Sequence, residues 1–224
     1  MIHTSDLIQS LAADIRPVRR LRPPAIRASG WLLIAGAIMV GLYFGKGLRP
    51  AFAERMSDTT FLIGMLASLA TGVLAAFAAF LVSLPDRSQR WLLLPLPPLV
   101  VWLSSIGYQC LAGWVGLPPG AVTPEAAAGC ASTLLVTSLP LAVAMLFMLR
   151  YAAAFRPVPV IIMGSLAVSA LTCTALAMFH PLDATVMVLG WNLATAAIVT
   201  GVALLINRRA SRQRRRHLRT TDRS

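Results

Sequence analysis

Long apolar blocks, separated by short polar segments, dominate this chain. A helix that crosses the hydrocarbon core of a bilayer needs about 20 consecutive apolar residues. Six blocks come close to or exceed that length, and they predict spans at residues 28–45, 59–84, 91–112, 126–149, 158–179 and 184–206. The pattern therefore predicts an all-α fold, an integral membrane bundle of six transmembrane helices with no separate soluble domain.

Polar segments precede and follow these blocks, and they divide the chain into three parts. Residues 1–27 form an N-terminal segment, residues 28–206 form the transmembrane domain, and residues 207–224 form an Arg-rich tail. The tail is interpreted as contacting anionic lipid, because basic residues close to a span bind the charged membrane surface. No direct contact with nucleic acid is expected.

The N-terminal segment has the pattern of a short amphipathic helix. Asp6 can cap such a helix, with Gln9 three positions later as in a capping box. Leu7, Ile8 and Leu11 share one face at helical spacing. The opposite face carries acidic residues and no Lys or Arg, which favours a protein partner over the membrane surface.

Basic residues are distributed unevenly among the predicted loops. The chain has 20 Lys+Arg against 8 Asp+Glu and a formal net charge of +12. Seventeen of the twenty lie in the N-terminal segment, the second and fourth loops and the tail, and the other three lie in the first loop. Because Lys and Arg accumulate on the cytoplasmic side, this asymmetry predicts that both termini are cytoplasmic.

The composition argues against most chemistry inside the membrane. The chain is 57% apolar and 12% charged, and the predicted spans contain no Asp, Glu, Lys or Arg. Ion-coupled transporters and proton relays keep ionisable groups there, so they are disfavoured, whereas a small uncoupled transporter or channel stays open as the alternative. There is no Gly-rich phosphate loop and no HExxH or CxxC motif. We predict neither an enzyme nor a cofactor, and the oligomeric state stays undetermined.

One pair of glycines invites a packing interpretation. Gly41 and Gly45 form a GxxxG pattern, which allows two helices to approach closely in a membrane. Small residues are common throughout the chain, so a chance occurrence is the preferred interpretation.

Potential soft ligands gather in the outer half of the predicted bundle. They are Cys110, Cys130, Cys173 and His180. Cysteine and histidine suit soft or borderline metals, and neighbouring thiols can oxidise. The alternative is that each cysteine is a small buried apolar residue, which is favoured for Cys173 because it lies deepest in the membrane.

Taken together, several short segments resemble the NrsF family of six-span bacterial integral-membrane anti-sigma factors. The resemblance covers nearly the whole chain, and it rests on the order and spacing of Asp6-Leu7-Ile8, residues 11–14, Pro17 to Pro24, Cys130, Ser138 to Ala142, Leu149 to Ala153, Phe179 to Asp183 and Trp191-Asn192.

The resemblance implies that the protein holds an extracytoplasmic-function sigma factor at the bacterial inner membrane until envelope, metal or oxidative stress releases it. The N-terminal segment is the expected binding site, because the predicted cytoplasmic loops are short and the tail offers little apolar surface. The expected sigma-factor-binding residues are Asp6, Leu7, Ile8, Leu11, Asp14, Val18, Arg19 and Arg20.

The family is also associated with a pair of sensing cysteines, and this chain departs from that pattern. Cys130 corresponds to the first cysteine, whereas Phe179-His180-Pro181 stands where the second is expected. We expect Cys130 and His180 to sense the signal and, if the signal is a metal, to be its candidate ligands. Cys173, two helical turns before His180, is an imperfect substitute for the second cysteine.

Overall fold

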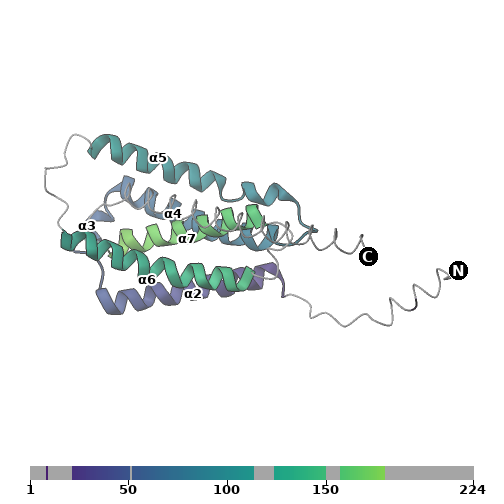
Figure 1. Cartoon of the computed structure of the whole chain (residues 1–224). Coiled ribbons are helices and arrows are strands. Elements are labelled where there is room, and N and C mark those ends of the chain that lie inside the picture. Colours follow the sequence, from purple (N-terminus) through teal and green to yellow (C-terminus); the bar gives the residue numbers. More distant parts are fainter. Residues whose placement is uncertain (1–8, 10–21, 51, 114–123, 150–156, 180–224) are drawn as a thin grey trace, which may run out of the picture.

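In the computed structural model, residues 9, 22–50, 52–113, 124–149 and 157–179 are described, and this part of the chain is all-helical with no strand. Its helices are α2 (Pro24–Lys46), α3 (Phe52–Arg55), α4 (Thr59–Val82), the 3₁₀ helix η1 (Gln89–Leu93), α5 (Leu96–Gly113), α6 (Pro124–Leu149) and α7 (Pro157–Phe179). The five long helices lie side by side, with α4 and α7 in the middle (Figure 1).

Proline sets the start of three long helices. Pro24, Pro124 and Pro157 are the first residues of α2, α6 and α7, a position where the missing N–H costs nothing and the fixed φ suits the helix. These starts lie one to four residues before the predicted apolar blocks. The largest difference is in α2, which starts four residues early and therefore includes Arg27. The Arg27 side chain is buried in the bundle.

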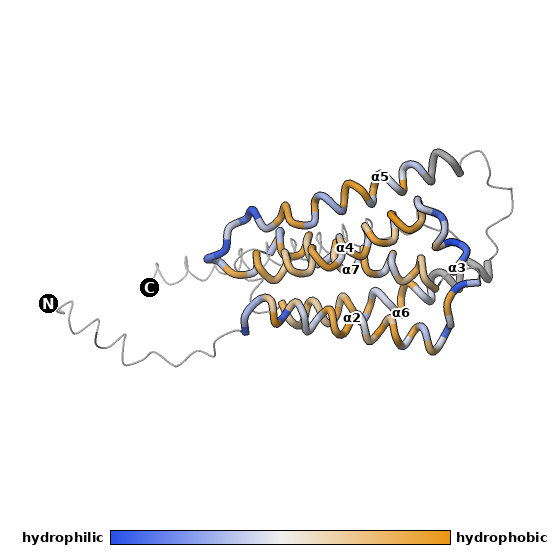
Figure 2. Tube along the Cα trace, turned by 180° about the vertical axis from the view of Figure 1, so that it is seen from behind, coloured by the Kyte–Doolittle hydropathy of each residue, from blue (hydrophilic) through white to orange (hydrophobic). Residues whose placement is uncertain are grey.

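Five of the described helical segments are long and apolar enough to cross a membrane, which indicates a membrane protein. Hydrophilic residues gather at the two ends of the bundle, and the middle parts of the helices are mostly apolar (Figure 2). Large apolar side chains face outward on this surface, as Leu33 and Phe44 do with 75% and 80% of their area exposed. Such a surface matches lipid, which needs no polar partner. The predicted sixth span, the N-terminal helix and the tail lie outside the described residues.

The closest packing joins α4 to α7, and small side chains allow it. The buried residues of α4 include Ala67, Ser68, Gly72 and several further alanines, and α7 contributes Ala167 and Ala170. Ser68 Oγ and Thr174 Oγ1 lie 2.9 Å apart and form a hydrogen bond between the two helices. Small residues let two helix backbones approach closely. Dispersion contacts between the helices then stabilise the pair, because the hydrophobic effect does not drive helices together in lipid.

Glycine contributes to this packing at Gly72 and not at the GxxxG pair. A Cβ on Gly72 would lie 2.8 Å from Leu171 Cγ and 3.2 Å from the Leu171 backbone nitrogen. A Cβ on Gly41 or Gly45 would meet nothing within 4 Å. The described helices therefore do not use the GxxxG pair of α2 for packing, which agrees with the preferred chance interpretation.

The third predicted span is a composite of two helices. The 3₁₀ helix η1 leads into α5 at Pro95, and Pro97 and Pro98 fall in the first turn of α5. Proline is tolerated in that turn but cannot continue a preceding α-helix. The proline cluster therefore marks a boundary near one end of the bundle, and α5 then packs against α4.

Candidate functional site

The expected sigma-factor-binding and sensing residues fall largely outside the described part of the chain. This holds for Asp6, Leu7, Ile8, Leu11, Asp14, Val18, Arg19, Arg20 and His180. Cys130 lies in the first half of α6, where the structure describes the backbone helix, and Cys110 lies near the end of α5. What the structure does describe is the framework that joins α6 to α2, the helix that follows the N-terminal segment.

Cys173 lies in the apolar interior of the bundle. It packs against a cluster formed by Ala67, Trp102, Ile106 and Ala170, and also against Leu134 of α6. Leu134 lies one helical turn after Cys130. The structure therefore places Cys173 among apolar side chains from several helices, as the packing interpretation predicts. Among the described residues no group of three or more His, Cys, Asp or Glu side chains comes together to hold a metal.

Arg27 defines one end of the contact between α2 and α6, here called the Arg27 end. Its Nη2 donates a hydrogen bond to the backbone carbonyl of Met148, and its guanidinium carbon lies 5.1 Å from the centre of the Phe80 ring. Met148 is the second-last residue of α6, where carbonyls have no partner within the helix. Both α6 and α4 end here, so the cation also meets the negative ends of two helix dipoles.

Trp31 forms the middle contact, one turn further along α2. Its Nε1 donates to the backbone carbonyl of Leu141 over 3.1 Å, and both side chains are fully buried. Leu141 follows Pro140, which has no N–H to donate to the carbonyl four residues before it. Trp31 thus contacts α6 at the residue that follows this internal proline.

Lys46 forms the third contact, at the opposite end of the bundle, here called the Lys46 end. Its Nζ lies 2.7 Å from Thr133 Oγ1 and 3.2 Å from Ser132 Oγ. The Thr133 side chain is 1% exposed, so the ammonium reaches a hydroxyl within the packed bundle. Ser132 and Thr133 lie two and three residues after Cys130 in the same helix.

The segment after α2 is held to the neighbouring helices. Gly47 ends the helix with φ 71°, in the left-handed region that glycine adopts without strain. The Arg49 N–H then donates to the Met178 carbonyl over 3.0 Å, and the Arg49 guanidinium carbon lies 5.8 Å from the centre of the Phe61 ring. The Lys46 end of α2 is thereby joined to the last turn of α7 and the first turn of α4.

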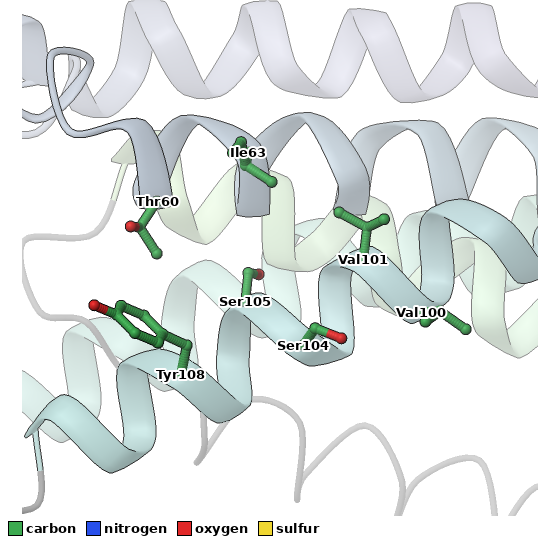
Figure 3. A pocket seen from close by; sticks show the side chains of 7 residues that line it. All are labelled: Thr60, Ile63, Val100, Val101, Ser104, Ser105 and Tyr108. Carbon is green, nitrogen blue, oxygen red and sulfur yellow. The ribbon is translucent and has the colours of Figure 1, made fainter.

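A shallow groove of about 420 Å³ lies between α4 and α5 (Figure 3). Its lining combines aliphatic side chains with hydroxyl groups, and no charged residue is among them. The lining residues are Thr60, Ile63, Val100, Val101, Ser104, Ser105 and Tyr108. The Ser105 hydroxyl donates to the Trp102 carbonyl over 2.7 Å, so part of this polarity is satisfied within α5.

Sequence reasoning overlooked the residues that join α2 to α6. Arg27 falls in the N-terminal segment predicted at 1–27, and the sequence predicts no contact with another helix for Trp31 or Lys46. Two signals were present. Lys46 is the only lysine in the chain, and Trp31 places an N–H donor inside an apolar block where a partner is required.

Comparison with known proteins supplies one match. A family model described as NrsF, negative regulator of sigma F, matches residues 11–212 of the 224 residues. No curated protein and no solved structure matches the chain. The matched range includes all five helical segments described above and the apolar block at 184–206.

Proposed function

The chain belongs to the NrsF family, whose name denotes a negative regulator of a sigma factor, and from this we propose that it is a membrane-bound anti-sigma factor. In this proposal it sequesters an extracytoplasmic-function sigma factor at the bacterial inner membrane and releases it on envelope, metal or oxidative stress. The family match over residues 11–212 is the observation that carries the proposal, and the five membrane-length helices support it.

The proposed binding element is the N-terminal segment. Both termini are assigned to the cytoplasm from the distribution of Lys and Arg. Leu7, Ile8 and Leu11 supply an apolar face, and burying one large side chain of this kind is worth about 1.5 to 3 kcal/mol. The flanking charged and linker residues complete the surface: Asp6, Asp14, Val18, Arg19 and Arg20. The Arg-rich tail at 207–224 contacts anionic lipid of the inner leaflet.

The test is the double substitution Leu7→Asp with Leu11→Asp, in a strain that reports sigma-dependent transcription. Because interface energy is concentrated in a few anchors, losing two of them abolishes sequestration. We expect constitutive expression of the reporter and loss of sigma-factor co-purification. Ser10→Asp with Ala13→Asp adds the same charge away from the face of Leu7, Ile8 and Leu11 and leaves repression intact. Retained repression by the Leu7/Leu11 variant, at normal membrane abundance, excludes this interface.

Sensing is assigned to Cys130 and His180, with a minor contribution from Cys173. Cysteine and histidine react with soft metals, and a thiol also reacts with oxidants. Cys173 is partly buried against apolar side chains of neighbouring helices, which limits its access to either signal. Cys130→Ser and His180→Ala are each expected to reduce reporter induction under metal or oxidant stress, whereas Cys173→Ser retains most of it. A full response from both of the first two variants excludes the site.

A further inference from the structure

Three residues of α2 donate side-chain hydrogen bonds to α6, at three levels of the bundle. Arg27 binds the Met148 carbonyl, Trp31 binds the Leu141 carbonyl, and Lys46 binds the hydroxyls of Ser132 and Thr133. We call this set of contacts the α2–α6 brace. It runs nearly the full length of α2, a helix of 23 residues with no proline after its first position.

The brace joins two helices that are less deeply embedded than the central pair. In the apolar stretches of α2 and α6, 28% and 33% of the residues are buried. The corresponding fractions are 56% in α4 and 67% in α7. The α4–α7 pair is fixed by close backbone approach at Gly72 and by the Ser68–Thr174 hydrogen bond. Within the described helices, a movement of α2 and α6 therefore disrupts fewer contacts than a separation of α4 from α7.

The two ends of the brace lie beside the two parts of the chain to which function is assigned. At the Lys46 end, the hydroxyls that accept from Lys46 follow Cys130 within one helical turn. At the Arg27 end, α2 begins only a few residues after Arg19 and Arg20 of the N-terminal segment. A continuous helix is stiff over this length, so a shift of its end at Lys46 moves its start as well.

We propose that the α2–α6 brace holds the N-terminal segment in its sigma-binding arrangement, and that Lys46 is the positioning residue through which a change beside Cys130 reaches it. The inference rests on the proposed anti-sigma function and deepens it. Breaking the Lys46 contact releases the end of α2 from α6, and α2 then shifts against α4 and α7. As a result, the conformation that binds the sigma factor is populated less.

The test replaces Lys46 with Met in the full-length membrane protein, which keeps the length of the side chain and removes the ammonium. The readout is a promoter that deletion of this chain induces. Lys46 is exposed, so losing its hydrogen bonds to Ser132 and Thr133 raises unstimulated expression a few-fold. Lys46→Arg retains a donor and stays near the parent level. Glu54→Gln, a charge change in exposed α3 at the same end, has no effect.

A second readout separates coupling from a local structural role. Ala28 is fully buried at the Arg27 end, about 27 Å along α2 from Lys46. In an Ala28→Cys background, N-ethylmaleimide labelling of the peptide that carries residue 28 is measured in membranes by mass spectrometry. Lys46→Met increases the labelling rate several-fold, and Glu54→Gln leaves it unchanged.

The outcomes are distinct. Unchanged reporter expression in Lys46→Met overturns the inference, as does raised expression with unchanged labelling at residue 28. If Lys46→Met does not accumulate, Ser132→Ala with Thr133→Val removes the acceptors from α6 instead and is judged by the same two readouts. The Leu7→Asp/Leu11→Asp variant leaves the brace intact, so its failure to derepress the reporter counts against the proposed binding segment alone.

Discussion

Trp31 shows how a single polar atom is accommodated among apolar side chains. Its indole ring is fully buried between α2 and α6, and its N–H points to the Leu141 carbonyl. An indole N–H without a partner is costly in an apolar interior, so the hydrogen bond fixes the rotation of α2 about its axis. The sequence places Trp31 in an apolar block but predicts neither its burial nor its acceptor, because the acceptor is a backbone carbonyl 110 residues away.

The first prediction concerns this residue. Trp31→Phe removes the N–H and part of the ring, so the lost hydrogen bond and the resulting cavity together destabilise the protein by about 1 to 3 kcal/mol. The expected result is a lower melting temperature of the detergent-purified protein. Trp91→Phe, at a ring that is 39% exposed in η1, is the matched control and leaves the melting temperature nearly unchanged. Equal shifts in the two variants contradict the assigned role of Trp31.

Individual residues also mark the limit of sequence reasoning. A GxxxG pattern can be recognised in any sequence, but its use depends on which neighbour faces it. Among the described residues, a Cβ on Gly41 or Gly45 would meet nothing within 4 Å, whereas a Cβ on Gly72, which belongs to no GxxxG pair, would lie 2.8 Å from Leu171 Cγ. Spacing along one helix defines a face, and only the arrangement of the other helices decides whether that face is covered.

Whole elements followed from the sequence more closely than individual contacts did. Four predicted blocks correspond to α2, α4, α6 and α7 within a few residues, since length and apolarity alone determine a membrane-spanning helix. The start of α4 is an example. Asp58 precedes the apolar block, and its Oδ1 accepts from the Thr60 N–H over 2.9 Å as an N-cap. The split of the third block into η1 and α5 was not predicted, although its prolines were evident.

The second prediction belongs to the α4–α7 pair. Gly72→Ala places a methyl group against Leu171, including its backbone nitrogen, so the two helices must separate. Overpacking of this kind costs about 1 to 3 kcal/mol, and we expect a lower melting temperature. Gly41→Ala in α2 is the matched control, because the methyl group has open space and alanine favours helix. If the two variants have the same melting temperature, α4 and α7 do not pack as closely at Gly72 as described.

At the scale of the whole molecule, the described helices alternate in direction between the Arg27 end and the Lys46 end. Arg27 contacts the last turn of α6 and approaches Phe80 near the end of α4, while Arg49 contacts the last turn of α7. Arg87 and Arg90 follow α4 at the Arg27 end, and Lys46, Arg49 and Arg55 lie at the other. The basic residues of successive loops therefore lie at opposite ends of the bundle, as the topology predicted from the Lys and Arg distribution requires.

The third prediction is the orientation of this bundle in the membrane. Seventeen of the twenty basic residues fall in segments assigned to one side, and basic residues close to spans are retained in the cytoplasm. Reporter fusions after Arg90 and after Ser224 should therefore read cytoplasmic, whereas fusions after Ser57 and after Pro119 should read periplasmic. A cytoplasmic fluorescent protein and a periplasmic phosphatase at each position provide reciprocal readouts.

The fusions at Ser224 and after Arg90 test different parts of this topology, and the fusion at Ser224 depends on the apolar block at 184–206. If residues 184–206 cross the membrane, six spans return the C-terminus to the side of the N-terminal segment. A periplasmic Ser224 with a cytoplasmic Arg90 leaves five spans and removes the Arg-rich tail from the inner leaflet. A periplasmic Arg90 inverts the bundle, and the Arg27 end then faces away from any cytoplasmic sigma factor. In that case Leu7, Ile8 and Leu11 cannot form the proposed interface, so the fusion after Arg90 decides whether sequestration by the N-terminal segment is geometrically possible.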